Sequence, residues 1–416
     1  MTKLIKLFKF LWSLNNHANR KQFIFAIREY MDVVKQTQLL STKLASPYNG
    51  EALHLGLNHK ILLVAHEFSR TGAPYAVLYL ARALFSIHGV RPVVISPCDG
   101  PLRGEFEQDG FPTIVDPLLF TYRNYSSEVC DFVASFDKVI VTSLASYNFI
   151  RHFRGIAKHL TWWLHETDAG FAALANANVD LPLLFAVCES MWLGSPLCLP
   201  LALQYASQDK LHLLLYGCPD TALPHRPHQS GKVVFSIVGT VHQRKGQDVF
   251  LDAIERLPEE LRCKAIFRFI GSPLPYDDTG AIFYGKMRAR AALIPEVECY
   301  ENMPLERLQE FYEETDVFVS ASRDDPMPIV ITQGLMYSKV CLCSSAIGHA
   351  KLLEDGKNGL VFTNESATEL SEKMAWLIQN PTKLAVLGTA GRAIYEKYFL
   401  MASFINHVGN LIKDFR

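Results

Sequence analysis

The chain has 416 residues, of which 49% are hydrophobic and 20% charged, a composition typical of a folded globular protein and not of a disordered one. This length predicts two or three domains of roughly 150 residues each, with enough core to fold without disulfides or a structural metal. The 41 basic and 42 acidic side chains give a net charge of -1, which argues against a nucleic-acid-binding protein.

The cysteine pattern indicates a reducing compartment. There are nine cysteines, an odd number, and none forms a C-x-x-C pair. Most lie in apolar runs, such as Cys341 and Cys343, as expected of buried free thiols. We therefore expect a cytoplasmic protein. Because histidines and cysteines show no spacing typical of metal ligands, we expect no metal site.

The N-terminal segment is basic and amphipathic. Residues 1–28 contain six lysines and arginines and no acidic residue. On a helical wheel Lys3, Lys6 and Lys9 share one side, and apolar residues cover most of the other. Such a helix is typical of peripheral binding to an anionic membrane, and it is also compatible with packing on the protein's own domain. The lysines interrupt the apolar run too often for a signal peptide or a membrane span.

From residue 60 the sequence alternates apolar strands with amphipathic helices. The predicted strands of the first half are 60–67, 91–96, 112–116, 138–143, 159–166 and 183–190, and the predicted helices are 73–89 and 102–110. This alternation is typical of a parallel sheet covered by helices on both faces. Ligands of such domains bind at the carboxyl ends of the strands.

A proline-rich stretch divides the chain. Residues 217–232 contain three prolines, two glycines and few apolar side chains, which is typical of a linker. The alternation then resumes, beginning with a strand at 232–240 and a helix at 247–258. The predicted organisation is a basic helical extension at 1–55, a first domain at 56–222, a linker at 223–230, a second domain at 231–395, and a C-terminal helix at 396–416 that packs back on the first domain.

Candidate residues of the first half lie on two loops that follow strands. No G-x-G-x-x-G, P-loop or G-x-S-x-G motif is present, which disfavours dinucleotide, ATP and serine-hydrolase sites. Gly72, in the turn 69–74, lets backbone N–H groups approach a ligand at a helix N-terminus, where anions are favoured. His165 ends a buried strand beside Glu166 and is expected to face the cleft between the domains.

Three loops of the second half add further candidates. They carry Arg244 and Lys245 after the first strand, Asp324 and Asp325 after a buried strand, and Gly348 and His349 on the following loop. Two adjacent cations at the carboxyl end of a strand suit a pyrophosphate. The carboxylates could accept hydrogen bonds from sugar hydroxyls, and the last pair would line the same cleft.

Several segments together resemble family 4 of the retaining glycosyltransferases, which have the GT-B fold. The most specific are SRTGAP at 69–74, WWLHE at 162–166, VGTVHQRKG at 238–246 and SRDDPMPIVITQGLMYS at 322–338, and IGHAKLLEDGKNGLVF is similar to the family's segment after its nucleotide site. The resemblance covers roughly residues 60–400. It implies an α/β protein with two Rossmann-like parallel-sheet domains that face a cleft.

The resemblance also implies a reaction: transfer of a sugar from a nucleotide-sugar donor with retention at the anomeric carbon, without a metal or cofactor. The acceptor would bind mainly the first domain and the donor the second. By this resemblance His165 would lie near the reacting sugar, Lys245 with Arg244 would neutralise charge on the leaving diphosphate, Asp325 would bind the donor sugar, Gln333 the nucleotide ribose, and Gly72 would let backbone N–H groups approach the diphosphate.

The sequence departs from the family pattern at four positions. The family usually has two glutamates eight positions apart, where this chain has Asp325 and Gln333. Glutamine removes one charge, so ribose binding should weaken. Thr240 stands where the family often has arginine, with Arg244 nearby to compensate, and Lys351 stands where it often has glutamate.

We expect a bacterial-type glycosyltransferase that builds a surface polysaccharide, lipopolysaccharide or lipid-linked glycan at the inner face of the cytoplasmic membrane. Its partners would be a nucleotide-sugar donor, a glycan or lipid-linked acceptor and an anionic membrane that contacts residues 1–28, with no nucleic acid. One alternative is a GT-B-like scaffold that has lost catalysis, which Gln333 and Lys351 motivate. A sugar-nucleotide epimerase with the same fold is another. The sugar, the base and the acceptor all remain open.

Overall fold

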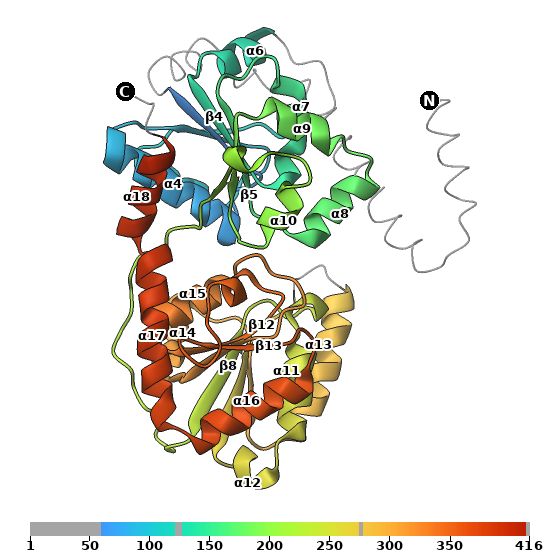
Figure 1. The fold of residues 1–416 in the computed structure, drawn as a ribbon, viewed down its shortest axis with the longest axis vertical. Helices are drawn as coiled ribbons and strands as arrows, with labels where there is room; N and C mark the ends of the chain where they lie inside the picture. The colour runs from blue at the N-terminus through green and yellow to red at the C-terminus, as the bar shows by residue number, and fades with distance from the viewer. Residues whose placement is uncertain (1–59, 121–126, 274–277, 413–416) are drawn as a thin grey trace, which may run out of the picture.

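Two α/β domains lie one above the other in the computed structural model, which describes residues 60–120, 127–273 and 278–412 (Figure 1). Each domain contains a parallel sheet, so the predicted pair of parallel-sheet domains is confirmed. The predicted helical extension at 1–55 lies outside the described residues.

The first domain is built on a seven-stranded sheet with the order β3-β2-β1-β4-β5-β6-β7. Its strands are β1 (Ile61–Val64), β2 (Val93–Ser96), β3 (Thr113–Val115), β4 (Lys138–Thr142), β5 (Leu160–Leu164), β6 (Ser190–Leu193) and β7 (Leu211–Leu213). All pairings are parallel. The central strands are buried along their whole length because helices cover both faces of the sheet.

The helices of the first domain connect these strands. They are α4 (Gly72–His88), α5 (Arg103–Gln108), α6 (Ser127–Ala134), α7 (Tyr147–Phe153), α8 (Asp168–Asn176), α9 (Leu181–Val187) and α10 (Cys198–Ala202), with short 3-10 turns η1 (Leu144–Ser146) and η2 (Gln208–Lys210). Helix α4 ends at Gly89, whose φ of 63° is the left-handed conformation that glycine adopts without strain.

One strand prediction was wrong. Residues 183–190, expected to form a strand, instead form most of α9 and lead into β6. Two start signals explain the helix: the Asp180 side chain accepts a hydrogen bond from the Leu183 N–H at 3.1 Å, and Pro182 occupies the first turn. A short apolar run is compatible with either structure, and the preceding cap decides between them.

The second domain is built on a six-stranded sheet with the order β10-β9-β8-β11-β12-β13. Its strands are β8 (Val233–Val238), β9 (Ala265–Ile270), β10 (Val297–Tyr300), β11 (Val317–Ser320), β12 (Val340–Ser344) and β13 (Leu360–Phe362). Its helices are α11 (Gln247–Arg256), α12 (Glu259–Arg262), α13 (Asp278–Ala291), α14 (Leu305–Glu314), α15 (Ile329–Met336) and α16 (Ala367–Gln379), with 3-10 turns η3 (Gln243–Lys245) and η4 (Gly348–Lys351).

Two helices carry the chain back to the first domain (Figure 1). Helix α17 (Thr382–Tyr398) packs along the second domain, and α18 (Met401–Leu411) packs against α4 of the first. Phe404 of α18 stacks on Trp163 of β5 with ring centroids 6.3 Å apart. The chain leaves the first domain near Cys218 and returns to it near Phe399. The Cys218 N–H donates to the Phe399 carbonyl at 2.7 Å, so the two connecting segments lie side by side.

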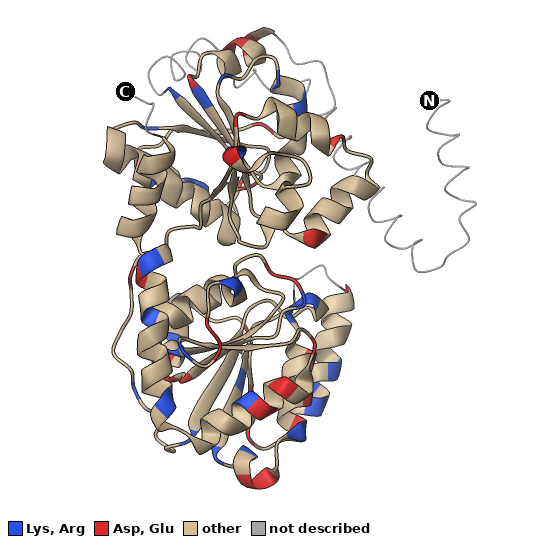
Figure 2. Cartoon of the chain, viewed as in Figure 1, with Lys and Arg blue, Asp and Glu red and all other residues tan. Residues whose placement is uncertain are grey.

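No single helix of the described part of the chain is long and apolar enough to cross a bilayer. Helices α8 and α9 meet the length and composition criteria only as a pair, and they are bent by 114° relative to each other. Residues 168–206 contain only three charged side chains, Asp168, Asp180 and Glu189. In Figure 2, charged residues are sparse along α8, α9 and α10 and more frequent along the outer helices of the second domain.

Candidate active site between the two domains

The loops that follow the strands of the two sheets meet between the domains. Thr167, after β5, donates a hydrogen bond to the Asp324 carboxylate, after β11. The Ser195 hydroxyl, after β6, donates to the Pro326 carbonyl at 2.7 Å. The carboxyl edges of both parallel sheets therefore face each other, and this is the edge where α/β sheets bind ligands.

The predicted cations lie against the predicted carboxylates. Lys245 forms an ion pair with Asp325. Arg244 donates from Nη1 to the Asp324 carbonyl at 2.6 Å, and the same nitrogen lies 3.7 Å from Asp325 Oδ2. These four residues thus form one cluster, in which the Asp325 side chain is 9% exposed and that of Lys245 is 26% exposed. An incoming diphosphate would compete with Asp325 for both cations.

Gly246 brings the cationic loop against β11. Its φ is 69°, and a Cβ placed there would lie 1.9 Å from the Ala321 carbonyl oxygen. Only glycine fits this close approach of two backbones. Because η3 ends at Gly246, the position of Lys245 depends on this contact.

Arg323 supports the same loop and was not predicted as a site residue. Its guanidinium makes a bidentate ion pair with Asp248 at 2.9 and 3.0 Å and also donates to the Gln243 carbonyl at 2.5 Å. Hydrogen bonding to Asp248 raises the pKa of Arg323 above its usual value, so the cation is permanent. The two segments are far apart in sequence, and the sequence contains no local signal of the pairing.

His165 lies at the carboxyl end of β5, as predicted. Burial, with a smaller effect of nearby His66, lowers the pKa of His165 to about 3, so the imidazole is neutral at pH 7. Its ring packs 4.5 Å from that of Trp163, and its Nε2 has no hydrogen-bond partner within the described residues. A neutral ring with an unused nitrogen can form a hydrogen bond with a ligand.

Glu166 fixes the backbone on which His165 sits. Its carboxylate accepts hydrogen bonds from the Ser143 hydroxyl, from the Leu144 N–H at 2.9 Å and from the His165 N–H at 3.0 Å. Gly194 packs closely against the His165 ring, since a Cβ on Gly194 would lie 2.8 Å from His165 Nδ1. The His165 ring therefore has little freedom to move.

Gly72 lies at the start of α4, opposite the second domain. A Cβ on Gly72 would come within 3.4 Å of Ile329 Cδ1, in the first turn of α15. No acidic side chain occupies the first turn of α4, so its free N–H groups and helix dipole favour an anion. This placement agrees with the predicted role near a diphosphate, which stays a prediction.

The side chains of two predicted site residues, Gln333 and His349, form hydrogen bonds within the second domain. Gln333, on α15, accepts a hydrogen bond at Oε1 from the Tyr312 hydroxyl at 2.9 Å, so only its amide NH₂ is uncommitted. His349 is fully buried, stacks on Phe399 with centroids 5.3 Å apart and pairs through Nε2 with Thr332 Oγ1 at 2.8 Å. Burial lowers the pKa of His349 to about 3. The side chain of His349 thus belongs to the interior, between Thr332 and Phe399.

Gly348 allows the two domains to touch. A Cβ at this position would lie 1.9 Å from the Pro326 carbonyl and 2.4 Å from Ser195 Oγ of the first domain. Within the described ranges, no group of three or more histidine, cysteine, aspartate or glutamate side chains could hold a metal ion. The candidate site contains two cationic side chains, two carboxylates and a neutral imidazole.

Comparison with known proteins finds a family match over the second domain. Residues 221–394 match the family model described as Glycosyl transferases group 1. The match spans the whole second sheet and less than half of the 416 residues. Within this domain lie the Lys245–Asp325 ion pair and Gln333.

Solved structures that resemble the whole described chain have the same two-domain fold. HepE of Anabaena in complex with UDP superposes with a TM-score of 0.73 at 17% identity, over 85% of this chain and 100% of that one. The lipopolysaccharide outer core galactosyltransferase WaaB gives a TM-score of 0.65 at 12% identity, over 85% and 99%. At these identities the likeness establishes the GT-B fold alone.

Curated relatives match over a shorter length. D-inositol 3-phosphate glycosyltransferase of Xylanimonas cellulosilytica is 24% identical over 182 residues, 43% of this chain and 42% of that protein. An uncharacterized glycosyltransferase of Methanocaldococcus jannaschii is 24% identical over 161 residues, 39% of this chain and 42% of that protein. The match thus spans less than half the length of either relative.

Proposed function

We propose that the protein is a retaining glycosyltransferase of family 4, which transfers a sugar from a nucleotide-sugar donor to a glycan or lipid-linked acceptor. The observation that carries the proposal is the cluster of Arg244 and Lys245 around Asp325 at the carboxyl edge of a group 1 glycosyl transferase domain. Thr167, which directly follows the WWLHE segment of the first domain, is hydrogen-bonded to Asp324 beside this cluster.

In the proposed reaction, the acceptor hydroxyl oxygen bonds to the anomeric carbon, the bond from that carbon to the donor phosphate oxygen breaks, and the hydroxyl proton passes to the leaving diphosphate. Negative charge grows on the leaving diphosphate. Lys245 and Arg244 would neutralise this charge, and the N–H groups at the start of α4 would add to the effect. Asp325, released from Lys245 by the diphosphate, would accept hydrogen bonds from the donor sugar. His165, neutral at pH 7, would hold a sugar hydroxyl. This scheme includes no metal or cofactor.

The nucleotide is the first unknown to resolve. Three similar HepE structures are complexes with UDP, with UDP and glucose, and with UDP-glucose, so uridine donors are the first to test. The experiment is a thermal-shift and turnover screen with UDP-, GDP- and ADP-sugars, with release of the nucleoside diphosphate as the readout. A stabilising nucleotide and turnover of its sugar would support the proposal. No shift and no turnover with any donor would overturn it.

A catalytically impaired scaffold is the second candidate. It is favoured by Gln333, whose carbonyl oxygen is committed to Tyr312, and by Lys351, which stands where the resemblance expects an acid. Large activation by Gln333→Glu would favour this candidate, whereas substantial wild-type turnover would exclude it. A donor-only assay would reveal the third candidate, an epimerase, because its product forms without acceptor.

The proposed location is the inner face of the cytoplasmic membrane. Support comes from the basic, amphipathic sequence of residues 1–28, which lie outside the described residues. Deleting residues 1–13 should abolish binding to anionic liposomes while leaving turnover of a soluble donor intact. Unchanged liposome binding would contradict the membrane proposal.

A further inference from the structure

A second histidine lies at the same edge of the first sheet as His165. His66 follows β1, two residues beyond Val64, on the loop that leads into α4. Strands β1 and β5 lie on either side of β4, so the two histidines flank the end of that strand. They are close enough for a charge on His66 to lower the pKa of His165. Neither the motifs nor the resemblance gave His66 a role.

One ring nitrogen of His66 has no use in the described protein. Nδ1 is buried and has no hydrogen-bond partner among the described residues, although the side chain as a whole keeps 21% of its surface exposed. A buried acceptor without a partner destabilises a folded protein unless a ligand or water supplies one. The ring therefore lies at the edge of the ligand-binding face, with one nitrogen available.

The other ring nitrogen faces a fixed carboxylate. His66 Nε2 lies 3.7 Å from Glu67 Oε1. The same oxygen accepts hydrogen bonds from the Ser69 hydroxyl at 2.6 Å and from the Thr71 hydroxyl at 3.3 Å, which hold it in place. A negative charge beside Nε2 favours the tautomer that carries its proton there. Nδ1 is then the lone-pair acceptor.

The ring keeps this acceptor at neutral pH. Burial lowers the pKa of His66, although Glu67 and Glu166 oppose the shift. A neutral ring in this tautomer can only accept at Nδ1, so the complementary ligand atom is a hydrogen-bond donor. Substrates of a sugar-transferring protein bind at the carboxyl edge of the sheet, and the hydrogen-bond donors that they offer there are mainly carbohydrate hydroxyls.

We propose that His66 is a second substrate-contacting histidine, which accepts a hydrogen bond from a sugar hydroxyl through Nδ1, beside His165. This inference rests on the proposed function. The hydroxyl can belong to the donor sugar or to the acceptor, since both reach this edge during transfer. The chemistry is the same in both cases, and the kinetic parameters distinguish the two sources.

The test uses three substitutions of His66 in the full-length protein. His66→Leu removes both ring nitrogens. His66→Asn places an amide oxygen near the position of Nδ1, whereas His66→Gln places its polar group near that of Nε2. The matched control is His88→Leu. Its Nε2 is also buried and unpartnered within the described residues, but it lines a cavity at the opposite, amino-terminal edge of the sheet with Lys60 and Asp137.

The measurements are kcat, the KM for each substrate and donor hydrolysis without acceptor. The probes are the donor found active in the screen, with free glucose, galactose and mannose as acceptors. We expect His66→Leu to lower kcat/KM by about tenfold, the size of one lost hydrogen bond. We expect His66→Asn to retain part of the kcat/KM that His66→Leu loses, and His66→Gln to retain none of it. The thermal unfolding midpoints of the three variants should equal or exceed that of the wild type. Reduced donor hydrolysis with a raised donor KM would show that the hydroxyl bound by His66 belongs to the donor sugar. A raised acceptor KM alone would show that the hydroxyl belongs to the acceptor.

Several outcomes would overturn the inference. Kinetic parameters of His66→Leu that match those of His88→Leu would overturn it and leave the proposed function standing. Equal losses in the Asn and Leu variants would show that packing, and not a hydrogen bond at Nδ1, matters. Wild-type protein without turnover of any nucleotide sugar would overturn the proposed function and this inference together.

Discussion

Thr167 of the first domain donates a hydrogen bond to the Asp324 carboxylate of the second. Thr167 follows His165 by two residues and Asp324 precedes Asp325, so the bond joins the two halves of the candidate site. The Ser195–Pro326 hydrogen bond lies beside it. Both bonds must break for the domains to separate and admit a donor between them.

Thr167→Val should therefore favour the open arrangement of the domains. Valine keeps the shape of threonine but cannot donate, and the lost bond to a carboxylate is worth about 1.5–3 kcal/mol. We expect a larger radius of gyration by small-angle X-ray scattering without nucleotide. The control is Thr161→Val, which removes a hydroxyl that pairs with Ser190 within the first sheet. Identical scattering from both variants would show that the Thr167–Asp324 hydrogen bond does not hold the two domains together.

Lys245→Ala should lower kcat by about 100-fold or more, the usual effect of losing a group that stabilises developing charge. Nucleoside diphosphate binding should weaken as well, which isothermal calorimetry would measure. Lys264→Ala, an exposed lysine of the same domain, serves as the control and should change neither. If Lys245→Ala retained wild-type kcat, the proposed role of the ion-pair cluster would be wrong.

Gln333→Glu should be accepted by the fold, because a glutamate oxygen can take the Tyr312 hydrogen bond that Gln333 Oε1 now takes. The second oxygen would be a charged acceptor for ribose hydroxyls, so we expect nucleotide affinity to rise by about two- to tenfold. Gln333→Ala should lower it. Equal affinities in all three proteins would show that this residue does not contact the nucleotide.

Stability should fall on acidification because two histidines are buried in the neutral form. The pKa of both His165 and His349 is lowered to about 3 from 6.5. Below pH 6.5 the unfolded chain binds protons that the folded chain does not, so the free energy of unfolding falls by about 1.4 kcal/mol per pH unit for each histidine until about pH 3. Urea unfolding between pH 7 and pH 5 measures the slope.

A substitution at His349 isolates that histidine's share of the slope. His349→Gln keeps a polar atom near Thr332 but does not titrate, so its stability should depend less steeply on pH than that of the wild type. A slope equal to that of the wild type would contradict a neutral, buried His349.

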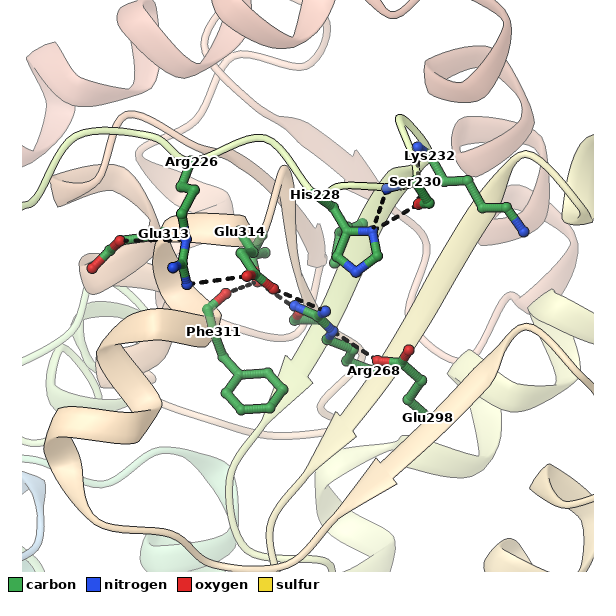
Figure 3. Close-up of polar contacts among 12 residues, drawn as sticks. Arg226, His228, Ser230, Lys232, Arg268, Glu298, Phe311, Glu313 and Glu314 are labelled. Atoms are coloured by element: carbon green, nitrogen blue, oxygen red, sulfur yellow. Dashed lines mark hydrogen bonds and ion pairs between the residues drawn. The ribbon is translucent and has the colours of Figure 1, made fainter.

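A buried arginine on β9 should contribute to the stability of the second domain. Figure 3 shows Arg268 between Glu298 and Glu314, with Arg226 of the linker also reaching Glu314. Arg268 is 4% exposed. We expect Arg268→Leu to cost about 3 kcal/mol, because it leaves two carboxylates without their buried partner.

Arg290→Leu is the matched control for this measurement. Arg290 also pairs with two carboxylates, Asp252 and Glu255, but its side chain is 41% exposed. Exposed pairs of this kind contribute about 1 kcal/mol or less. Chemical denaturation of both variants measures the difference, and equal losses would mean that burial of Arg268 adds nothing.

The sequence was most informative where strands end. Periodicity and loop composition located Lys245 and Asp325 on separate loops at the carboxyl ends of strands, where ligands bind. The ion pair between the two residues was not predicted. The sequence did not predict the directions in which the side chains of Gln333 and His349 point. Gln333 turns to Tyr312 and His349 to Phe399, partners on other elements that only tertiary packing brings near.

Supporting residues were also hard to predict. Arg323 lies on the loop after β11 and Asp248 in the first turn of α11, and a charged residue in a loop is expected to be solvent-exposed until its partner is placed. The misassigned run at 183–190 has another cause: its apolar letters suit a buried strand, and the helix depends on a cap at Asp180 that lies before the run.

The route of the chain determines how the domains can be produced separately. The first domain owes part of its core to α18, which follows the whole of the second domain in the sequence. A polypeptide that stops at the linker would leave Trp163 and one face of α4 without the helix that covers them. We expect such a truncation to be insoluble. A version in which the segment Met401–Leu411 is joined by a short artificial connection after residue 218 should express as an independent domain, suited to acceptor-binding measurements without the nucleotide half.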